Sequence, residues 1–434
     1  MQSLQNKEIE AKTRALLVGI VTRDADIQTV ESELDELERL LDTAGGVAVV
    51  RVVQSKDTPD PRTLIGSGKV REISELCENN DIDLVVTDED LSPAQIRNLE
   101  DDIGHDVRVI DRSMLILDIF AAHAVTGEGK LQVELAQLRY TAPRLIGKGA
   151  EMSRLGGGIG TRGPGESKLE SDRRHIQRRI TALEAQLSEM EKNRMTMRAS
   201  RDKSGLPKVA IVGYTNAGKS TLLNRMTDAG ILAEDKLFAT LDPTTRKFEL
   251  PGGESILLTD TVGFIRKLPH HLIKAFKSTL DEAVYADALM IVIDVSDPEH
   301  PEQVKVTEEL LEELGAAGKP TLYVFNKCDL GISDPWMPGK TAENVHTVAV
   351  SAKTGQGVER LLEEMQAILH EGKKRVTFHI PNSRAGALNT LYRYATVEDV
   401  EYGADEIVAT AVVDAKAHGM LKEFDPTWRE KEEE

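Results

Sequence analysis

Cysteine is almost absent from this chain of 434 residues. Cys77 and Cys328 are the two cysteines, and they lie far apart in the sequence. Two isolated cysteines give neither a disulfide framework nor the paired ligand spacing of a structural zinc site. Folds that depend on either kind of cross-link are therefore excluded.

Long apolar runs are also missing. No run approaches the roughly 20 apolar residues that cross a bilayer. Residues 1–4 are followed by the charged stretch 6–14 rather than by the apolar core of a signal peptide. We expect a protein that stays in the cytoplasm. Its length predicts several domains, since one domain usually takes about 100–200 residues.

Basic residues are outnumbered by acidic ones, 54 Lys and Arg against 73 Asp and Glu, so the formal net charge is −19. That balance argues against general coating of nucleic acid. The stretch from Arg139 to Arg179 is an exception, with ten basic residues against four acidic ones. A basic stretch in an acidic protein predicts one defined contact with a polyanion, and a solvated helix face is the alternative interpretation.

The N-terminal residues 1–111 alternate between two kinds of segment. Apolar runs rich in β-branched residues occupy 16–22, 47–54, 84–88 and 107–111, and amphipathic stretches such as 29–43 and 93–103 lie between them. This is the βαβ pattern of a small parallel sheet covered by helices.

Two long helices are predicted next, over 112–140 and 167–198, and the first is weakened in its middle by Gly127 and Gly129. In the second, the apolar residues follow the alternating three-and-four spacing of a coiled-coil seam: Leu169, Ile176, Ile180, Leu183, Leu187 and Met190. We expect residues 112–199 to form an antiparallel helical-hairpin arm. The segment 143–166 would be its tip, rich in glycine and basic residues.

The rest of the chain alternates again after a linker at 200–207. Strands are expected near 208–213, 245–250, 255–259, 289–294, 321–326 and 345–350, with helices between them. This predicts an α/β domain over 208–372. A small α+β tail over 373–434 would follow, with a first strand, a helix near 385–394, a second strand near 407–413 and a disordered, charged end.

A phosphate-binding loop is the first motif that carries chemistry. The pattern G-x-x-x-x-G-K-[ST] follows the apolar strand 209–212 and precedes a helix that begins near Thr221; its residues are Gly213, Tyr214, Thr215, Asn216, Ala217, Gly218, Lys219 and Ser220. Backbone N–H groups and the helix N-terminus favour bound phosphate. Lys219 is expected to contact the β- and γ-phosphates, and Ser220 to bind Mg²⁺. A chance glycine-rich loop is the alternative.

Two further motifs identify the base. Each follows a predicted strand: Asn326, Lys327, Cys328 and Asp329 come first, then Ser351, Ala352 and Lys353. The Asp329 carboxylate can accept two hydrogen bonds from guanine, and adenine would leave it unpaired at a cost of about 1–3 kcal/mol. Asn326 is expected to tie this loop to the P-loop, and Ser351–Lys353 to offer an N–H to guanine O6. The predicted nucleotide is GTP.

The γ-phosphate is expected to be sensed by two loops. Asp260, Thr261, Val262 and Gly263 follow the strand 255–259. Asp260 would hold Mg²⁺ through water, and the Gly263 N–H would bond the γ-phosphate, so that phosphate loss releases the following segment. The other loop contains Phe238, Ala239, Thr240, Leu241 and Asp242. Thr240, Thr244 and Thr245 all compete there for the position of Mg²⁺ ligand.

Together these motifs resemble the translation-factor-related P-loop GTPases, and other segments narrow the match. Residues 111–120, 132–138, 143–145, 156–160, 162–166 and 238–242 are similar to the HflX family. The resemblance implies that Thr240 joins Ser220 as a Mg²⁺ ligand, so Lys219, Thr240, Asp260 and Gly263 would be the catalytic residues. It also implies binding to the large ribosomal subunit and its rRNA, separation of stalled or idle ribosomes under stress, and ATP binding by the N-terminal domain as a further possibility. The basic, glycine-rich tip suits rRNA. We expect a monomer.

Phe264 stands where many small GTPases carry the glutamine that orients the attacking water. Phenylalanine cannot orient water, and HflX-like proteins share an apolar residue there. The sequence therefore predicts slow hydrolysis by the protein alone and stimulation by the ribosome.

Other signals carry less weight. Residues 64–69 superficially resemble a second phosphate loop but lack its spacing and are expected to be a turn before a helix. His270 and His271 are expected to be a solvated pair rather than a metal site. Two other functions stay open: a GTP-dependent scaffold on membranes or envelope proteases, and an ATP-driven RNA-remodelling enzyme. The lack of an apolar anchor argues against the first, and the lack of a second phosphate loop against the second.

Overall fold

The chain folds into two compact units in this computed structural model. The structure describes residues 12–23, 25–145, 164–202, 206–227, 237–238, 243–269, 272, 277–331, 345–370, 374–413 and 415–426. The N-terminal unit comprises Met1–Met190, Glu234–Asp242 and Arg266–Lys277, and the C-terminal unit comprises Glu191–Ala233, Pro243–Ile265 and Ser278–Glu434. Two short segments from the second half of the chain thus fold with the N-terminal unit.

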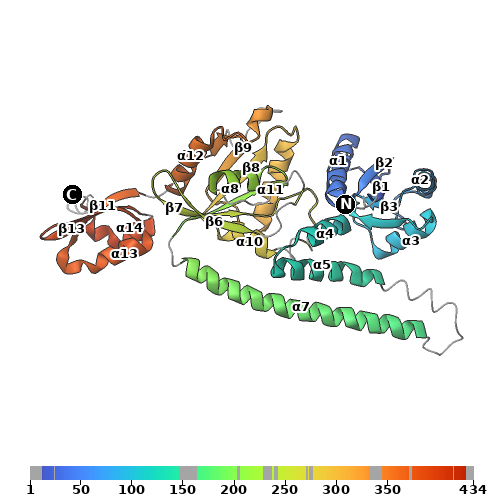
Figure 1. Ribbon diagram of the computed structural model, residues 1–434, viewed down its shortest axis with the longest axis horizontal. Coiled ribbons are helices and arrows are strands. Elements are labelled where there is room, and N and C mark those ends of the chain that lie inside the picture. Colours follow the sequence, from blue (N-terminus) through green and yellow to red (C-terminus); the bar gives the residue numbers. More distant parts are fainter. Residues whose placement is uncertain are drawn as a thin grey trace, which may run out of the picture. The chain divides into compact units, whose positions relative to one another are not determined.

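The N-terminal unit is built on a parallel sheet, as predicted. The strands β1 (Arg14–Val21), β2 (Val47–Ser55), β3 (Leu84–Thr87) and β4 (Arg108–Asp111) lie in the order β2-β1-β3-β4. Figure 1 labels the first three of them. The helices are α1 (Ile27–Thr43), α2 (Ser67–Asn79) and α3 (Pro93–Ile103). The predicted βαβ pattern is confirmed.

Alternation along β1 explains why helices cover both faces of this sheet. Leu16, Val18 and Ile20 belong to a buried cluster with apolar residues of α2 and α3. Gly19 points the other way, where an added Cβ would lie 2.7 Å from Val30 of α1. Side chains alternate between the faces of a strand, so the apolar run needs cover on each side.

The predicted single helix over 112–140 is wrong. The structure has two helices, α4 (Arg112–His123) and α5 (Gly127–Leu145). α4 ends at His123, and the Thr126 hydroxyl accepts a hydrogen bond from the Gly129 N–H at 3.0 Å, which caps α5. Gly127 and Gly129 weaken a continuous helix at this point, and the capping bond supplies an alternative.

The predicted helical hairpin is present, formed by α5 and α7 (Pro164–Asp202) (Figure 1). Leu135 of α5 is buried against Ile180 and Leu183 of α7, and partly buried apolar residues from both helices surround them. Arg139–Glu184 and Arg179–Glu134 ion pairs flank this seam. Residues 146–163, most of the predicted glycine-rich tip, lie outside the described residues.

Asp111, fully buried at the end of β4, fastens the start of the arm. Its Oδ1 accepts from the Met114 N–H and begins α4, and its Oδ2 accepts from the Leu91 N–H and from the hydroxyl of Tyr140. The Arg144 guanidinium also reaches this carboxylate and stacks on the Tyr140 ring. One carboxylate therefore joins the sheet, α4 and α5.

The C-terminal unit contains a six-stranded sheet in the order β10-β9-β8-β5-β7-β6. The strands are β5 (Lys208–Gly213), β6 (Thr244–Glu249), β7 (Ser255–Asp260), β8 (Ala288–Asp294), β9 (Thr321–Asn326) and β10 (His346–Ala349). Each predicted strand is confirmed to within one residue. Since β6 is antiparallel and the others run parallel, the carboxyl ends of five strands meet at one edge, where ligands bind in such sheets.

Helices cover both faces of this sheet as well. The helices are α8 (Lys219–Thr227), α10 (Lys277–Tyr285), α11 (His300–Glu313) and α12 (Val358–His370). Leu222 of α8 and Leu361 of α12 belong to one buried cluster with Val209 and Met290. Leu289 and Ile291 alternate with Met290 along β8 and line a pocket with Leu311 of α11.

The tail is a small α+β fold, as predicted. Its strands β11 (Lys374–Pro381), β12 (Thr396–Tyr402) and β13 (Glu406–Val413) form an antiparallel sheet in the order β11-β13-β12, with α13 (Gly386–Tyr394) and α14 (Ala415–Leu421). Phe378, Leu391 and Phe424 belong to its buried core. β12 and α14 were not predicted, and residues 427–434, predicted to be disordered, lie outside the described residues.

None of the described helices combines the length and the apolar character that a membrane span requires. α7 has the length, at 39 residues, but charged side chains recur throughout it.

Candidate nucleotide-binding site

The P-loop takes a course that only glycine allows at two positions. Gly213 and Gly218 have φ angles of 139° and 93°. A Cβ on Gly213 would lie 2.3 Å from the Val292 carbonyl oxygen, and one on Gly218 would lie 2.2 Å from the Asn326 side-chain nitrogen. Positive φ and these close approaches explain both glycines of the motif.

The Lys219 side chain is held over this loop by carbonyl groups of the loop. Its ammonium donates to the carbonyl oxygens of Gly213 at 3.1 Å and Tyr214 at 2.8 Å. The side chain is buried, and burial lowers the pKa of Lys219 to about 8, although the charge of Asp260 acts in the opposite direction. An ammonium carries three N–H donors, so this geometry fixes the cation and suits it to an anionic ligand.

Ser220 and Asp260 are brought together from α8 and the end of β7. The Ser220 hydroxyl donates to Asp260 Oδ2 at 2.6 Å, and Asp260 is fully buried. A hydroxyl and a carboxylate are the oxygen donors that Mg²⁺ prefers. The residues present therefore fit this metal ion.

The other predicted Mg²⁺ ligands are placed differently. Thr244 lies opposite Asp260 in the β6–β7 ladder, and the Thr245 hydroxyl is hydrogen-bonded to that of Thr259 at 3.0 Å. Ala239, Thr240, Leu241 and Asp242 lie outside the described residues.

The segment after Asp260 runs along the P-loop. The Thr215 N–H donates to the Phe264 carbonyl at 2.8 Å, and the Phe264 N–H donates to the Gly213 carbonyl at 3.1 Å. Gly263 packs so closely that a Cβ there would lie 2.8 Å from both the Lys219 ammonium and Thr215. The Phe264 side chain is only 1% exposed, which places it in the protein interior.

Asn326 joins three loops at the end of β9. Its side-chain nitrogen donates to the Ala217 carbonyl at 2.8 Å, and its side-chain oxygen accepts from the Ala352 N–H at 2.9 Å. Lys327 adopts a left-handed conformation and pairs with Asp294 at 2.6 Å. Asp329 is exposed beyond it. The arrangement leaves the carboxylate of Asp329 accessible to a ligand.

Two supporting residues were missed by the sequence reasoning. Arg225 of α8 donates to the carbonyl of Ala352 at 3.1 Å and also to that of Lys353, so it supports the loop that follows β10. Asp294 holds Lys327. Its position at the end of β8, at the same edge as the other motifs, is the sequence signal that could have found it.

Phe238 lies in a different unit from the other predicted residues that the structure describes. It belongs to the N-terminal unit, where its ring meets that of Phe120 edge to face at 4.7 Å. The neighbouring Leu237 N–H donates to the Thr43 hydroxyl at 3.3 Å. In this structure Phe238 is a core residue, because an apolar ring gains more from burial there than from a polar site.

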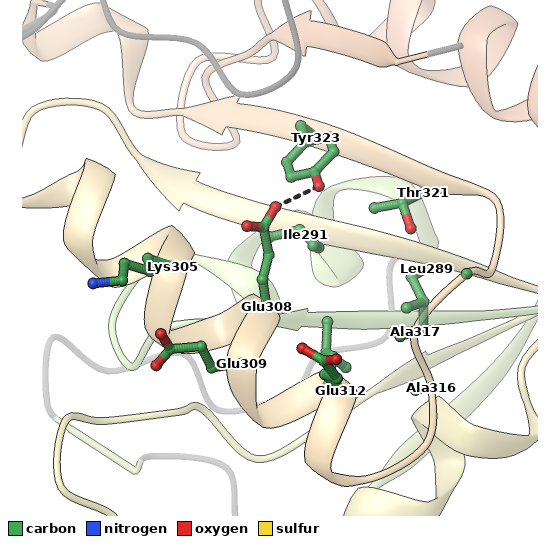
Figure 2. Close-up of a pocket in the computed structure, with 12 residues that line it drawn as sticks. Leu289, Ile291, Lys305, Glu308, Glu309, Glu312, Ala316, Ala317, Thr321 and Tyr323 are labelled. Atoms are coloured by element: carbon green, nitrogen blue, oxygen red, sulfur yellow. Dashed lines mark hydrogen bonds between the residues drawn. The ribbon is translucent and has the colours of Figure 1, made fainter. Parts of the chain in front are cut away.

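A separate pocket lies beside α11 in the C-terminal unit (Figure 2). Its volume is about 360 Å³, its floor includes Leu289 and Ile291, and Glu308, Glu309 and Glu312 stand at its rim. The Tyr323 hydroxyl donates to Glu308 at 2.6 Å, and burial together with this carboxylate raises the pKa of Tyr323. Its lining includes none of the predicted nucleotide motifs, so we do not assign the nucleotide to it.

Comparison with known proteins agrees with this geometry. Three family models match successive parts of the chain: GTP-binding GTPase N-terminal over residues 31–121, GTP-binding GTPase Middle Region over 123–201, and 50S ribosome-binding GTPase over 208–327.

Curated relatives match almost the whole length. The chain is 50% identical to GTPase HflX from Lacrimispora saccharolytica, over 96% of this chain and 97% of the relative. It is 48% identical to GTPase HflX from Caldanaerobacter subterraneus, over 95% and 94%. It is 43% identical to GTPase HflX from Escherichia coli, over 90% of each chain.

Proposed function

Because this chain belongs to the HflX family and is a GTPase, we propose that it binds the large ribosomal subunit in a GTP-controlled manner and separates stalled or idle ribosomes under stress. The observation that carries the proposal is the match of a 50S ribosome-binding GTPase model to residues 208–327. Such a protein would act as a monomer in the cytoplasm, where ribosomes are found.

GTP is the substrate, and the roles of individual residues are part of the proposal. Lys219 would neutralise charge on the β- and γ-phosphates, and the Gly263 N–H would bond the γ-phosphate. Ser220 and Thr240 would hold Mg²⁺, with Asp260 acting through water, and the ion would neutralise charge that develops on the phosphates. The bond between Ser220 and Asp260 supports this set.

Recognition of guanine is assigned to the exposed Asp329, with Ala352 and its neighbours facing O6. The support for this is the position of Asn326, which ties both base-reading loops to the P-loop. A rigid frame of this kind lowers the entropy cost of ordering the site around its ligand.

Hydrolysis is proposed to be slow without a partner. The buried Phe264 offers no polar group to an attacking water. A ribosomal group would then complete the site, as trans-acting groups do for other GTPases.

The arm is the proposed contact with ribosomal RNA. Its basic balance, ten basic against four acidic residues from Arg139 to Arg179, supports this assignment in a chain of net charge −19. Cations that neutralise phosphates release counterions, so the affinity should fall steeply as salt rises.

Co-sedimentation with separated ribosomal subunits tests the proposal. The full chain is mixed with large or small subunits in GTP analogue, GDP or ATP at several salt concentrations. We expect binding to the large subunit that is strongest with the GTP analogue and weakens with salt. Binding that is equal in all nucleotides would refute control by GTP, and binding that requires ATP would favour the RNA-remodelling alternative.

A further inference from the structure

Lys267 lies just beyond the nucleotide motifs, in a segment that folds with the N-terminal unit. Its ammonium contacts three carboxylates, Glu33 and Asp88 at 2.8 Å each and Glu89 at 2.7 Å. Burial acts to lower the pKa of Lys267, but the carboxylates outweigh it and the pKa is raised. The cation and its acidic partners therefore stabilise one another.

Arg112 binds the backbone of Arg266, the residue that precedes Lys267. This guanidinium is 2% exposed and donates to Asp88 at 2.7 Å, to Glu36, and to the backbone carbonyl of Arg266 at 3.0 Å. The Arg266 side chain in turn donates to the Ser32 hydroxyl at 2.8 Å. Arg266 and Lys267 are thus bound by hydrogen bonds and ion pairs from α1, from the end of β3 and from the start of α4.

We call this contact the latch, defined as Arg266 and Lys267 with Ser32, Glu33, Asp88, Glu89 and Arg112. Withdrawing Lys267 would take away the ion pair of the nearly buried Glu33 carboxylate and leave Asp88 with Arg112 alone, which is more costly than breaking a surface ion pair. The latch therefore resists any movement of the chain that pulls on Arg266 and Lys267.

The latch begins at Arg266, three residues along the chain from Gly263. Phe264 and Ile265 are the two residues between Gly263 and Arg266, and each is only 1% exposed. Gly263 itself is packed against Thr215 and the Lys219 ammonium without room for a Cβ.

GTP has to enter this arrangement with its γ-phosphate between Lys219 and the Gly263 N–H, both of which contact that group in P-loop GTPases. Gly263 must then retreat from Lys219, and the buried residues after it transmit the shift. GDP makes no such demand, because it lacks the γ-phosphate.

We propose that Lys267 sets the preference between GDP and GTP, because the latch holds Gly263 against Lys219 and so opposes GTP. By linkage, GTP must weaken the latch by the same free energy by which the latch weakens GTP binding. The strength of the contacts that Arg266 and Lys267 make in the N-terminal unit therefore depends on whether GTP or GDP is bound. This inference rests on the roles proposed above for Lys219 and Gly263.

The test compares full-length Lys267→Met with the wild type. Dissociation constants for GDP and for a non-hydrolysable GTP analogue are measured at one ionic strength. We expect the ratio of the analogue's constant to that of GDP to fall by at least about fivefold, the lower end of usual coupling between sites. Lys267→Arg, which keeps the charge, should stay near the wild-type ratio, and Glu89→Gln should shift it part of the way.

Lys305→Met is the matched control. Lys305 also forms an ion pair, with Glu302 at 3.6 Å, but it lies on α11, and its loss should leave the ratio unchanged. A ratio within twofold of the wild type for Lys267→Met, or an equal loss of affinity for both nucleotides, would overturn the inference.

Hydrogen exchange of α1 gives an independent readout. In the wild type, exchange near Ser32 and Glu33 should rise when the GTP analogue replaces GDP, and in Lys267→Met this difference should vanish. No difference in the wild type would refute the transmission. Lys219→Ala separates the two proposals, since unchanged affinity for both nucleotides would overturn the site itself rather than the latch.

Discussion

Asn326 and Asp329, three positions apart in the loop after β9, differ in their surroundings. Asn326 is 2% exposed, and both ends of its side-chain amide are engaged by the P-loop and by Ala352. Asp329 is exposed and lies past the turn that Lys327 makes. The first residue joins the loops, and the second is accessible for the proposed contact with guanine.

Asp329→Asn should transfer the preference from guanosine to xanthosine nucleotides. The amide presents an N–H to the xanthine 2-carbonyl, whereas guanine loses bonds to a carboxylate worth about 1.5–3 kcal/mol each. GTP affinity should then fall at least about tenfold, measured by competition between GTP and XTP. Cys328→Ser, one residue away, should keep the guanine preference, and an unchanged preference in Asp329→Asn would refute the base-reading role.

Elements whose signals are local could be predicted from the sequence. The apolar runs predicted the parallel strands of both sheets, because β-branched and apolar residues between turns favour a buried strand. The P-loop was predictable because phosphate chemistry fixes its spacing. The break at Ala124 was missed because it depends on a capping bond from Gly129 to Thr126 that competes with a continuous helical pattern.

Long-range charge contacts could not be predicted. Lys267 meets Glu33 across 234 positions and Asp88 across 179 positions. Periodicity reports which face of an element is buried and not which distant side chain covers it. The ring contact between Phe238 and Phe120 was not predicted for the same reason, because the two residues are remote in sequence.

At the level of the arm, Tyr140→Phe should loosen α5 from the sheet. The Tyr140 hydroxyl donates to the fully buried Asp111, and a hydrogen bond to a charged group contributes about 1.5–3 kcal/mol. Urea unfolding of the full chain should show a loss of this size in the transition that includes the N-terminal unit. Tyr392→Phe, at an exposed position on α13, should change stability by less than about 0.5 kcal/mol. An equally small loss for Tyr140→Phe would remove Asp111 from its role as anchor.

At the scale of the whole molecule, nucleotide hydrolysis and ribosome contact are assigned to different segments, and deletion of residues 156–165 tests whether they separate. Nucleotide affinity and the rate of the isolated protein should stay within about twofold of the wild type, because these residues lie outside every nucleotide motif. Large subunits should speed GTP hydrolysis by the intact chain at least tenfold, a small gain beside the roughly 10³–10⁵-fold that groups supplied in trans give other GTPases. The deletion should abolish that stimulation, measured as phosphate release at saturating GTP. Stimulation that survives the deletion would place the ribosome contact elsewhere on the chain, and equal rates with and without subunits in the wild type would mean that the protein completes its own site despite Phe264.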